Sequence, residues 1–459
     1  MNSVQRKITA ALLISTFLAA IEVTIISTAM PRIAESLGGI ELMSWVFAIY
    51  LLTTAVSTPI WGKLADLIGR KTVFMTGVVV FLTGSLLCGL SQTMEILILF
   101  RAIQGIGAGA LNPVTFTIIA DVFSFEQRAK VQGLVSSMWG IAGIFGPLVG
   151  GFLVDFISWH WVFFINIPFG LVSMWMIGRH FKETLEKRKR KIDVWGALTF
   201  TVGMTAFLFA MLSADTEAGY DVSKPVLFGL YAAAFVFLAV FVFIQKNHEE
   251  PMMPLYLFKN RNVAIANAAS FLNSAILIGL TAYLPLWTQR VLEMGATASG
   301  FTLMPLCIGW LFGSMLCSAL LKRIGTKGIA VLGVALIALG AISLAGISAS
   351  TPLWFIAFCI LLCGHGFGLS FTVFTLVIQS SVPLHNRGSA GSLNSLLRTL
   401  GQTIGVAVLG TALNAYLPDR IAEGLHAVFF LSAAIGIASL FITLWIPKQT
   451  QEQIERQLS

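Results

Sequence analysis

Long runs of apolar residues follow one another along almost the whole chain, with only short polar segments between them. A helix needs about 20 apolar residues to cross the hydrocarbon layer of a bilayer. The runs therefore predict fourteen transmembrane helices, near residues 8–30, 45–62, 72–91, 95–119, 131–155, 161–178, 194–213, 225–245, 263–285, 301–321, 328–347, 353–380, 390–414 and 426–446. The predicted fold class is an all-α integral membrane protein.

Composition supports the same conclusion. Of the 459 residues, 57% are hydrophobic and only 11% are charged, whereas a soluble domain carries about 25% charged residues. A soluble protein has no way to cover so much apolar surface, but lipid covers it. The first apolar run is too long, and continues too directly through Pro31 towards the next, to be a cleavable signal peptide.

The basic residues indicate the orientation in the membrane. An even number of spans places both termini on one side, and with the termini in the cytoplasm most of the 29 Lys and Arg residues are cytoplasmic. The exceptions are Arg32, Lys224, Arg290 and Arg420 outside, and Arg101 and Arg398 within spans. The densest basic run is at residues 187–191. This is the positive-inside pattern, which accounts for the net charge of +8 without nucleic acid as a partner.

Two short patterns recur in the second half of the chain. Residues 68–71 are echoed by residues 324–327 at the equivalent place after the tenth span. The spacing of Arg128, Ser136 and Gly146 is repeated by Arg387, Ser395 and Gly405. We therefore predict two six-helix halves, residues 1–190 and 251–459, with two inserted helices in residues 191–250; internal repeats that flank a central site are a known transporter plan.

Four motifs in order resemble those of the major facilitator superfamily, and specifically its drug:proton antiporter family with fourteen spans. Residues 62–71 resemble the signature loop between spans two and three, and residues 101–105 resemble the second motif. Residues 140–151, with Gly143, Gly146, Pro147 and Gly150, resemble the antiporter motif. Residues 21–31 are similar to the first-span motif, with Glu22 where the family typically has Asp.

This resemblance implies proton-coupled efflux of hydrophobic or cationic drugs by alternating access. The expected partners are drug-like small molecules, protons and lipid, and no cofactor is expected. We expect a monomer in a cell membrane; short loops and the lack of an N-x-[ST] site favour a bacterial one. The alternative is proton-coupled uptake or export of a specific metabolite by the same fold, against which the antiporter-like fifth span argues.

Glu22 is the only carboxylate that the pattern places deep within a span. An ionised group at the bilayer centre costs about 2.5–3.5 kcal/mol, so Glu22 is expected to face a cavity or a partner. In the resembled family the first and fourth spans line one cavity, which implies a relationship between Glu22 and Arg101. We expect drug and proton to compete for Glu22; the alternative is a buried glutamate that serves only packing.

The loop after the second span is expected to act as a gate. Asp66 is able to accept hydrogen bonds from cationic side chains or from helix N-terminal amides, and Gly62 and Gly69 permit a tight turn. Arg70 and Lys71 contribute to this gate and also fit the positive-inside pattern. In the fifth span, Gly143, Gly146 and Gly150 allow close helix contact, and Pro147 removes one backbone donor.

Further polar residues lie within the predicted spans. Arg398, with Asn394 one turn earlier, either lines the cavity or bonds to backbone carbonyls. His365 either relays protons, since imidazole titrates near neutral pH, or packs as a hydrogen-bonded histidine. The candidates for the substrate cavity are Gln104, Asn112, Asn273, Asn394 and Gln379.

Enzymatic chemistry lacks a signature in this chain. It contains no H-E-x-x-H motif, nucleophile elbow or G-x-x-x-x-G-K-[ST] loop. The glycines of residues 105–109 lie inside an apolar run without a preceding strand, which indicates helix packing. Cys359 and Cys363 lie one turn apart near His365, but no further ligands cluster there, so no metal site is expected. The sequence predicts a secondary transporter.

Overall fold

The computed structural model describes residues 1–123, 125–181, 183, 193–213, 223–249, 251–383 and 386–447. The basic run at residues 187–191 and the predicted border at residue 190 lie outside the described residues. Within them are 14 helices that are long and apolar enough to cross a membrane, and no strand is assigned there. The prediction of an all-α membrane protein with fourteen spans is confirmed.

The elements in chain order are α1 Ser3–Leu37, η1 Ile40–Leu42, α2 Met43–Ile68, α3 Arg70–Gly89, α4 Met94–Val122, α5 Phe125–Phe156, α6 Trp161–Phe164, α7 Asn166–His180, α8 Val194–Leu212, α9 Lys224–Asn247, η2 Leu255–Lys259, α10 Arg261–Arg290, α11 Ala296–Ala345, α12 Leu353–Ser380, α13 Arg387–Asn414 and α14 Ile421–Leu444.

Three spans are divided differently from the apolar runs. The sixth span is built from the short α6 followed by α7, with Ile165 between them. The tenth and eleventh spans both lie within the residues of α11, on the two sides of Gly325. Gly325 has a φ of 65°, in the left-handed region that glycine adopts without a steric penalty. Gly325 therefore separates spans ten and eleven as Gly69 separates α2 from α3.

Packing divides the described chain into two compact units. The first unit contains α1 to α9 and the first residues of α11, Met294–Gly300 being grouped with it. The second unit contains η2, α10, α11 from Phe301 onward, and α12 to α14. The inserted helices α8 and α9 thus pack with the first half of the chain. The three-part division drawn from the sequence stays a prediction.

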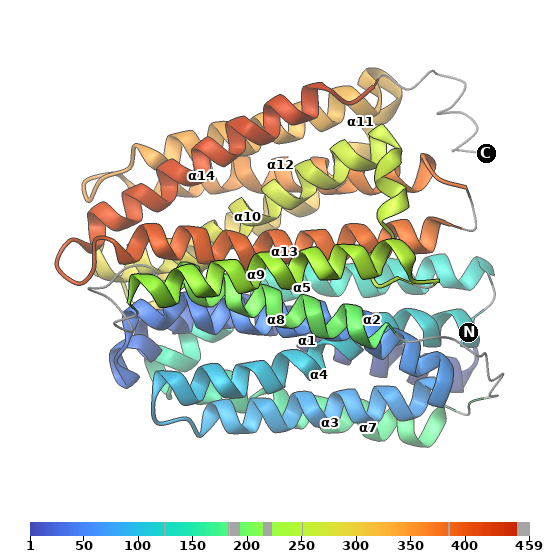
Figure 1. Cartoon of the computed structure of the whole chain (residues 1–459). Coiled ribbons are helices and arrows are strands. Elements are labelled where there is room, and N and C mark those ends of the chain that lie inside the picture. Colours follow the sequence, from blue (N-terminus) through green and yellow to red (C-terminus); the bar gives the residue numbers. More distant parts are fainter. Residues whose placement is uncertain are drawn as a thin grey trace. The chain divides into compact units, whose positions relative to one another are not determined.

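In the first unit, α1 packs against α5 and α7, while α4 packs against both α2 and α3 (Figure 1). The inserted helices α8 and α9 lie side by side (Figure 1), and α8 contacts α2. One such contact places the ring centroids of Trp45 and Phe209 5.9 Å apart. The two insert helices are therefore an addition to the α2 side of the first bundle.

Asp193 forms hydrogen bonds at both ends of the insert. It lies at the N-cap of α8 and accepts a hydrogen bond from the Gly196 amide at 2.9 Å. Gln245, near the end of α9, donates to the same carboxylate at 2.5 Å, and the Met252 amide donates at 3.3 Å. Because Asp193 is only 4% exposed, these bonds satisfy a buried charge and join the start of α8 to the segment after α9.

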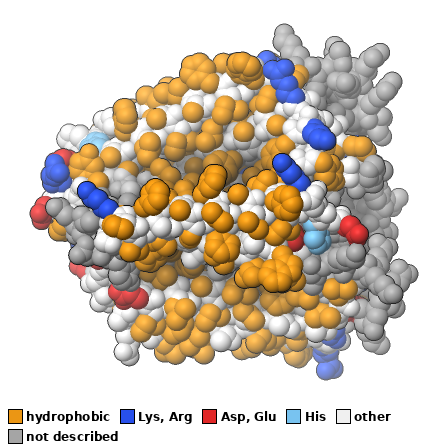
Figure 2. Space-filling view, in the orientation of Figure 1, with side chains coloured by type: hydrophobic (Ala, Val, Ile, Leu, Met, Phe, Trp, Pro, Cys, Tyr) orange, Lys and Arg blue, Asp and Glu red, His pale blue; other side chains and the backbone are white. Residues whose placement is uncertain are grey.

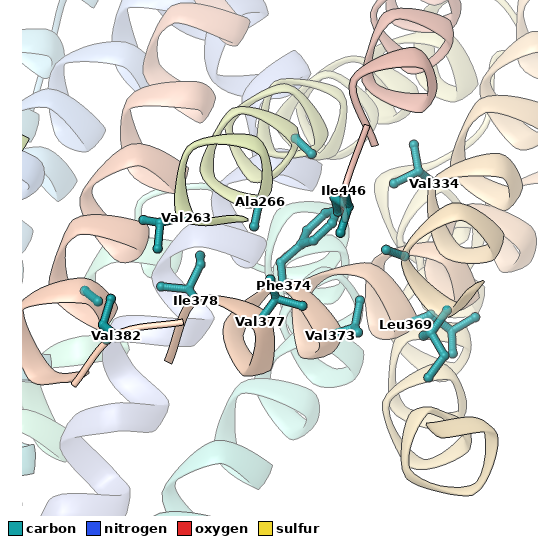
Figure 3. Close-up of a cluster of buried hydrophobic side chains, with 14 of the residues drawn as sticks. Val263, Ala266, Val334, Leu369, Val373, Phe374, Val377, Ile378, Val382 and Ile446 are labelled. Atoms are coloured by element: carbon teal, nitrogen blue, oxygen red, sulfur yellow. The ribbon is translucent and has the colours of Figure 1, made fainter. Parts of the chain in front are cut away.

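In the second unit, α10 packs against α12, α13 and α14. Its core includes a cluster of buried aliphatic residues around Phe374 of α12 (Figure 3). The Phe374 ring points towards Ile446, and Val263 and Ala266 of α10 lie in the same cluster (Figure 3). Phe374 is fully buried, so this core holds α12 against α10.

Glycines in α4 permit close approach to two neighbours at once. Gly105 and Gly109 contact α2, at Tyr50 and Ser57 respectively, and Gly107 contacts Phe81 of α3. A Cβ atom at any of these glycines would overlap the neighbouring helix. The α4 glycines therefore set how closely α2, α3 and α4 pack.

The same triplet, with the same spacing, recurs in α12 as Gly364, Gly366 and Gly368. Gly364 and Gly368 contact the first part of α11, which forms the tenth span, at Leu306 and Trp310. Gly366 contacts the second part of α11, the eleventh span, at Gly333 and Ile337. The α12 glycines thus hold spans ten and eleven as the α4 glycines hold spans two and three, which supports the repeat of two six-helix halves.

The surface agrees with a protein embedded in lipid. On the face shown in Figure 2, hydrophobic side chains cover the middle of the helices and most charged side chains lie towards their ends. The apolar window of α9 is only 11% buried, and its exposed side chains include Phe228, Phe235 and Phe243. Apolar surface of this extent is stable in a bilayer and costly in water.

Candidate functional site

The first unit contains a buried ion pair between two transmembrane helices. Arg101 Nη1 of α4 donates to Glu22 Oε1 of α1. Glu22 is 0% and Arg101 is 1% exposed. The structure thus brings together the two ionisable residues that the sequence analysis singled out in the first and fourth spans. Because a buried charge is stable only when it is paired and hydrogen-bonded, this contact accounts for both residues being tolerated at membrane depth.

Glu22 has a second partner that sequence reasoning missed. Asn166, the first residue of α7, donates from Nδ2 to Glu22 Oε2 at 2.6 Å and to Ser85 Oγ of α3 at 2.9 Å. Ser85 in turn donates to the Phe163 carbonyl oxygen at 2.8 Å. The only signal for Asn166 in the sequence is an amide within an apolar run, two residues before Pro168. The packing of α7 against α1 and α3 places it beside the carboxylate.

Arg101 is supported by more than the carboxylate. Its Nη1 also donates to Gln104 Oε1 at 2.7 Å, and its Nε donates to the Val46 carbonyl oxygen at 3.3 Å. Its Cζ lies 4.1 Å from the centroid of the Tyr50 ring, within the range of a cation–π interaction. Gln104 Nε2 donates to Ser85 Oγ at 3.2 Å. The guanidinium therefore keeps several contacts if it loses Glu22.

This network explains how a helix that is apolar around Glu22 holds a carboxylate. Along α1, the neighbours of Glu22 are hydrophobic and buried, as expected from the sequence. Its polar partners come from helices packed against α1, namely α4 and α7, with α3 behind them. The result is a continuous polar centre, here called the Glu22 network, made of Glu22, Arg101, Gln104, Asn166 and Ser85.

The predicted gate is an ionic cluster at the loop between α2 and α3. Arg70 Nη2 lies 3.7 Å from Asp66 Oδ1, and Arg70 Nε lies 3.2 Å from Asp121 Oδ2 at the end of α4. Gly69 has a φ of 103°, a conformation that favours glycine. Gly62 lies close to Pro113 of α4. The loop thus ties α2, α3 and α4 together.

Glu183, just beyond α7, belongs to the same cluster and was not predicted. Its Oε1 accepts from the Arg70 amide at 2.5 Å and its Oε2 accepts from the Lys71 amide at 3.3 Å. A carboxylate at this place compensates the positive end of α3 and satisfies two of its unpaired amides. Lys71 Nζ donates to the Gly178 carbonyl oxygen at 2.5 Å. Glu183 therefore binds two N-terminal amides of α3, next to the ion pair of Asp66 with Arg70.

The glycines of the antiporter-like motif pack α5 against α1. A Cβ atom at Gly146 would overlap Thr24, and one at Gly150 would overlap Ile25 and Thr28. Thr24 Oγ1 donates to the Ala142 carbonyl oxygen at 3.1 Å. Gly143 and Pro147 are also buried, and α5 continues through Pro147 as one helix. This contact begins, at Thr24, within one turn of Glu22 along α1.

The predicted polar residues of the second unit do not gather around one carboxylate. Asn273 is fully buried, accepting from Ser439 at 2.8 Å, and Asn394 donates to Asn267 at 3.0 Å. His365 Nδ1 lies 2.9 Å from the Leu361 carbonyl oxygen, and a Cβ atom at Gly309 or Gly313 would overlap the His365 backbone. This geometry is that of a packed, hydrogen-bonded histidine.

The remaining predicted cavity residues lie apart from these contacts. Arg398 Cζ lies 3.9 Å from the centroid of the Phe371 ring. Asn112 of α4 is partly buried and Gln379, near the end of α12, is exposed. Whether these side chains contact a substrate stays a prediction.

The described residues form fourteen apolar helices, and the first unit holds a buried charged network; these features define a polytopic membrane protein with a polar centre. The family model of the Major Facilitator Superfamily matches residues 12–406. The chain is 38% identical over 401 residues to "Multidrug resistance protein 3" of Bacillus subtilis (strain 168), covering 87% of this chain and 78% of that protein. It is 30% identical over 438 residues to "Multidrug efflux pump SdrM" of Staphylococcus aureus (strain N315), covering 95% of each.

Among solved structures, a D-xylose-proton symporter superposes with a TM-score of 0.71 at 15% identity, over 97% of this chain and 99% of that one. At this identity the likeness concerns the fold alone. Together with the family match, these findings show that the chain belongs to the Major Facilitator Superfamily. It is a multi-pass membrane transporter and not an enzyme.

Proposed function

We propose that the protein exports hydrophobic or cationic drug-like compounds in exchange for protons, by alternating access. The names of its relatives, a multidrug resistance protein and a multidrug efflux pump, support export of such compounds. Their bacterial sources support a place in a bacterial cell membrane. We further propose that it acts as a monomer with both termini in the cytoplasm, as the distribution of Lys and Arg favours.

The observation that carries this proposal is the Glu22 network. Ionised Glu22 is held by Arg101 and Asn166 in the structure. A proton on Glu22 removes its attraction to Arg101, which still has Gln104, the Val46 carbonyl and the Tyr50 ring. The network therefore has a supported arrangement for each protonation state. In the conformation that binds drug, a cationic compound takes the place of Arg101 at the carboxylate, and protonation from outside releases it.

The electrochemical proton gradient drives such an exchange. Exchange of one proton for a neutral compound moves one net charge, which contributes about 2.3 kcal/mol per 100 mV, whereas exchange for a monovalent cation moves no net charge and is driven by the pH gradient. In this proposal, the cluster of Asp66, Arg70, Asp121 and Glu183 latches α2, α3 and α4 in one of the alternating states. The small residues of α5, Gly146 and Gly150 among them, let α1 and α5 move as one packed body.

The test is transport by Glu22→Gln protein in proteoliposomes with an imposed pH gradient. Glutamine retains the size of the side chain and its acceptor for Asn166 but loses the titrating charge. Proton-driven efflux of a fluorescent cationic dye is expected to fall about 5–150-fold, which is the factor by which one bound ligand usually changes the affinity for another. Vesicles of known orientation also give the direction of transport, which separates export from uptake.

Glu35→Gln is the matched control, because Glu35 is an exposed carboxylate on the same helix, paired with Arg32 at 2.9 Å. It is expected to transport as the wild type does. Undiminished proton-driven efflux by a normally inserted Glu22→Gln protein would refute the assignment of Glu22 as the coupling residue.

A further inference from the structure

A polar stripe runs along α13 in the second unit. Ser395, Arg398, Thr399 and Gln402 are spaced as i, i+3, i+4 and i+7, so they share one face of the helix. All four are partly or fully exposed in the chain. The apolar window of α13 is also the least apolar of the 14. A stripe with a cation at membrane depth is costly against lipid, and such residues face water-filled cavities instead.

The Arg398 guanidinium lies on a cluster of aromatic rings. Phe371 of α12, beneath it, stacks with Phe367 at a centroid distance of 5.7 Å and an interplanar angle of 12°. Trp310 of α11 lies 5.3 Å from Phe371 and 5.9 Å from Phe367. Phe367 and Phe371 are buried, whereas Trp310 and Arg398 are partly exposed. A ligand would therefore meet one flat ring and one guanidinium.

Within the described part of the chain, no carboxylate forms an ion pair with this cation. Among the described residues, Arg398 makes no hydrogen bond or ion pair, and its recorded contact is with the face of Phe371. A guanidinium has five N–H donors in its plane, and stacking on a ring leaves that edge available. Arg101 also lies over an aromatic ring, but Glu22 neutralises it. The site at Arg398 thus has the cation and the ring of the first unit without the anion.

We propose that Trp310, Phe367, Phe371 and Arg398 form a binding site for an aromatic compound that carries a carboxylate. The carboxylate binds the free edge of the guanidinium, in the two-bond geometry that arginine and carboxylates favour, and the aromatic ring of the compound packs on Trp310. This inference rests on the proposed export of small molecules and extends its substrates to acidic and zwitterionic aromatics.

The test compares three probes with the same ring: anthracene-9-carboxylate, its methyl ester, and 9-(aminomethyl)anthracene. Binding to the full-length protein is measured by fluorescence in phosphatidylcholine nanodiscs without a gradient, so a failure of proton coupling does not affect the result. Wild-type protein is expected to bind the carboxylate about tenfold more tightly than the ester, because the carboxylate makes one more charge-assisted hydrogen bond to the guanidinium than the ester does. Arg398→Gln is expected to abolish that preference while ester binding changes less than about twofold.

Two further variants separate charge from packing. Arg398→Lys retains the charge and is expected to retain part of the carboxylate preference, and Trp310→Leu is expected to weaken all three probes by a similar factor. Arg420→Gln is the matched control. Arg420, like Arg398, lies over an aromatic ring, with its Cζ 5.2 Å from the centroid of the Tyr416 ring, but 61% of its side chain is exposed. It is expected to leave all three affinities unchanged.

Three outcomes would overturn the proposal. The first is an unchanged ratio of carboxylate to ester binding in both Arg398 variants. The second is a loss of all three probes together in well-folded Arg398→Gln protein, which would indicate a packing role. The third is an effect of Arg398→Gln seen only in nanodiscs that contain phosphatidylglycerol, which would assign the guanidinium to a lipid headgroup.

Discussion

The two halves of this transporter share their packing and differ in their polar centres. Glycine triplets in α4 and α12 contact two partner helices each in the same pattern. Gly146 packs α5 on α1, and Gly405 packs α13 on α10 at Ala275. Within these equivalent frames, the first unit holds a neutralised ion pair and the second an arginine on an aromatic ring. Helix contacts are thus repeated, while the charged residues are specific to each half.

This difference shows which part of the structure each function requires. Close helix contact depends on small residues at fixed spacing, and both halves need it to pack. An ion-binding centre needs a carboxylate with balanced partners, and Glu22 of the first unit, paired with Arg101, is such a carboxylate. We therefore expect substitutions at packing positions to destabilise both halves, and substitutions of the two arginines to have effects of different kinds.

The largest difference is expected between Arg101→Gln and Arg398→Gln. Removing Arg101 leaves the carboxylate of Glu22 buried and unpaired, which costs about 3–5 kcal/mol. Removing Arg398 leaves no such charge, so its effect on unfolding is expected to be smaller. The free energy of unfolding in detergent measures both. The double variant Glu22→Gln with Arg101→Gln is expected to regain stability without regaining proton-driven transport; equal losses for the two single variants would contradict this difference.

Intermediate effects are expected from alanine at the paired glycines. Overpacking of a helix contact costs about 1–3 kcal/mol. At Gly405 the added methyl would lie 2.5 Å from the Cα of Ala275, and backbone has no rotamer by which to move away. At Gly146 it would meet the side chain of Thr24. The unfolding temperature of Gly405→Ala protein is therefore expected to be lower than that of Gly146→Ala protein. Gly140→Ala is the control and is expected to leave the unfolding temperature unchanged, because a Cβ atom there meets nothing within 4 Å.

The smallest effect concerns the corners after α5 and α13. His160 stacks on Trp159 with 3.7 Å between ring centroids, and its Nδ1 lies 2.7 Å from Ser158 Oγ. Burial lowers the pKa of His160 below its ordinary value of 6.5. The unfolded chain therefore takes up this proton at a higher pH than the folded one, so stability falls as pH drops through 6.5 and is recovered above it.

Between about pH 7.5 and pH 5.5, the wild type is expected to lose more thermal stability than His160→Gln. The corner after α13 has an arginine, Arg420, over Tyr416 in place of a stacked histidine. Arg420→Gln should therefore shift the unfolding temperature equally at both pH values. A wild type and a His160→Gln protein with parallel pH profiles would show that the stacked imidazole has no part in acid sensitivity.

The spans could be predicted because hydropathy is a local property of each run. The pair of Glu22 and Arg101 was expected only through family resemblance, since nothing local joins positions on α1 and α4. Asn166 and Glu183 were missed because their partners come from helices distant in the sequence. The number of spans is therefore readable from single segments, while the composition of a buried polar centre follows from how the segments pack.

Connections between spans were harder to predict than the spans. One residue with positive φ, Gly325, separates the tenth span from the eleventh, as Gly69 separates α2 from α3. The sixth span was predicted as one helix, and its two helical segments meet at Ile165, whose backbone is itself helical. Hydropathy records neither where a single glycine ends a helix nor which side chain of a span faces a partner.

The buried Asp193 has a consequence for the covalent tether between the halves. Along the chain, the segment from the end of α7 to the start of α10, which includes α8 and α9, connects the two halves. Asp193 is hydrogen-bonded to the start of α8, to Gln245 and to Met252. The insert therefore lengthens the chain between the halves without adding a free connecting segment of the same length. Among the described residues, the first covalent connection from the first unit to the second therefore begins at Met253, with η2 and its flanking residues, and does not include the insert.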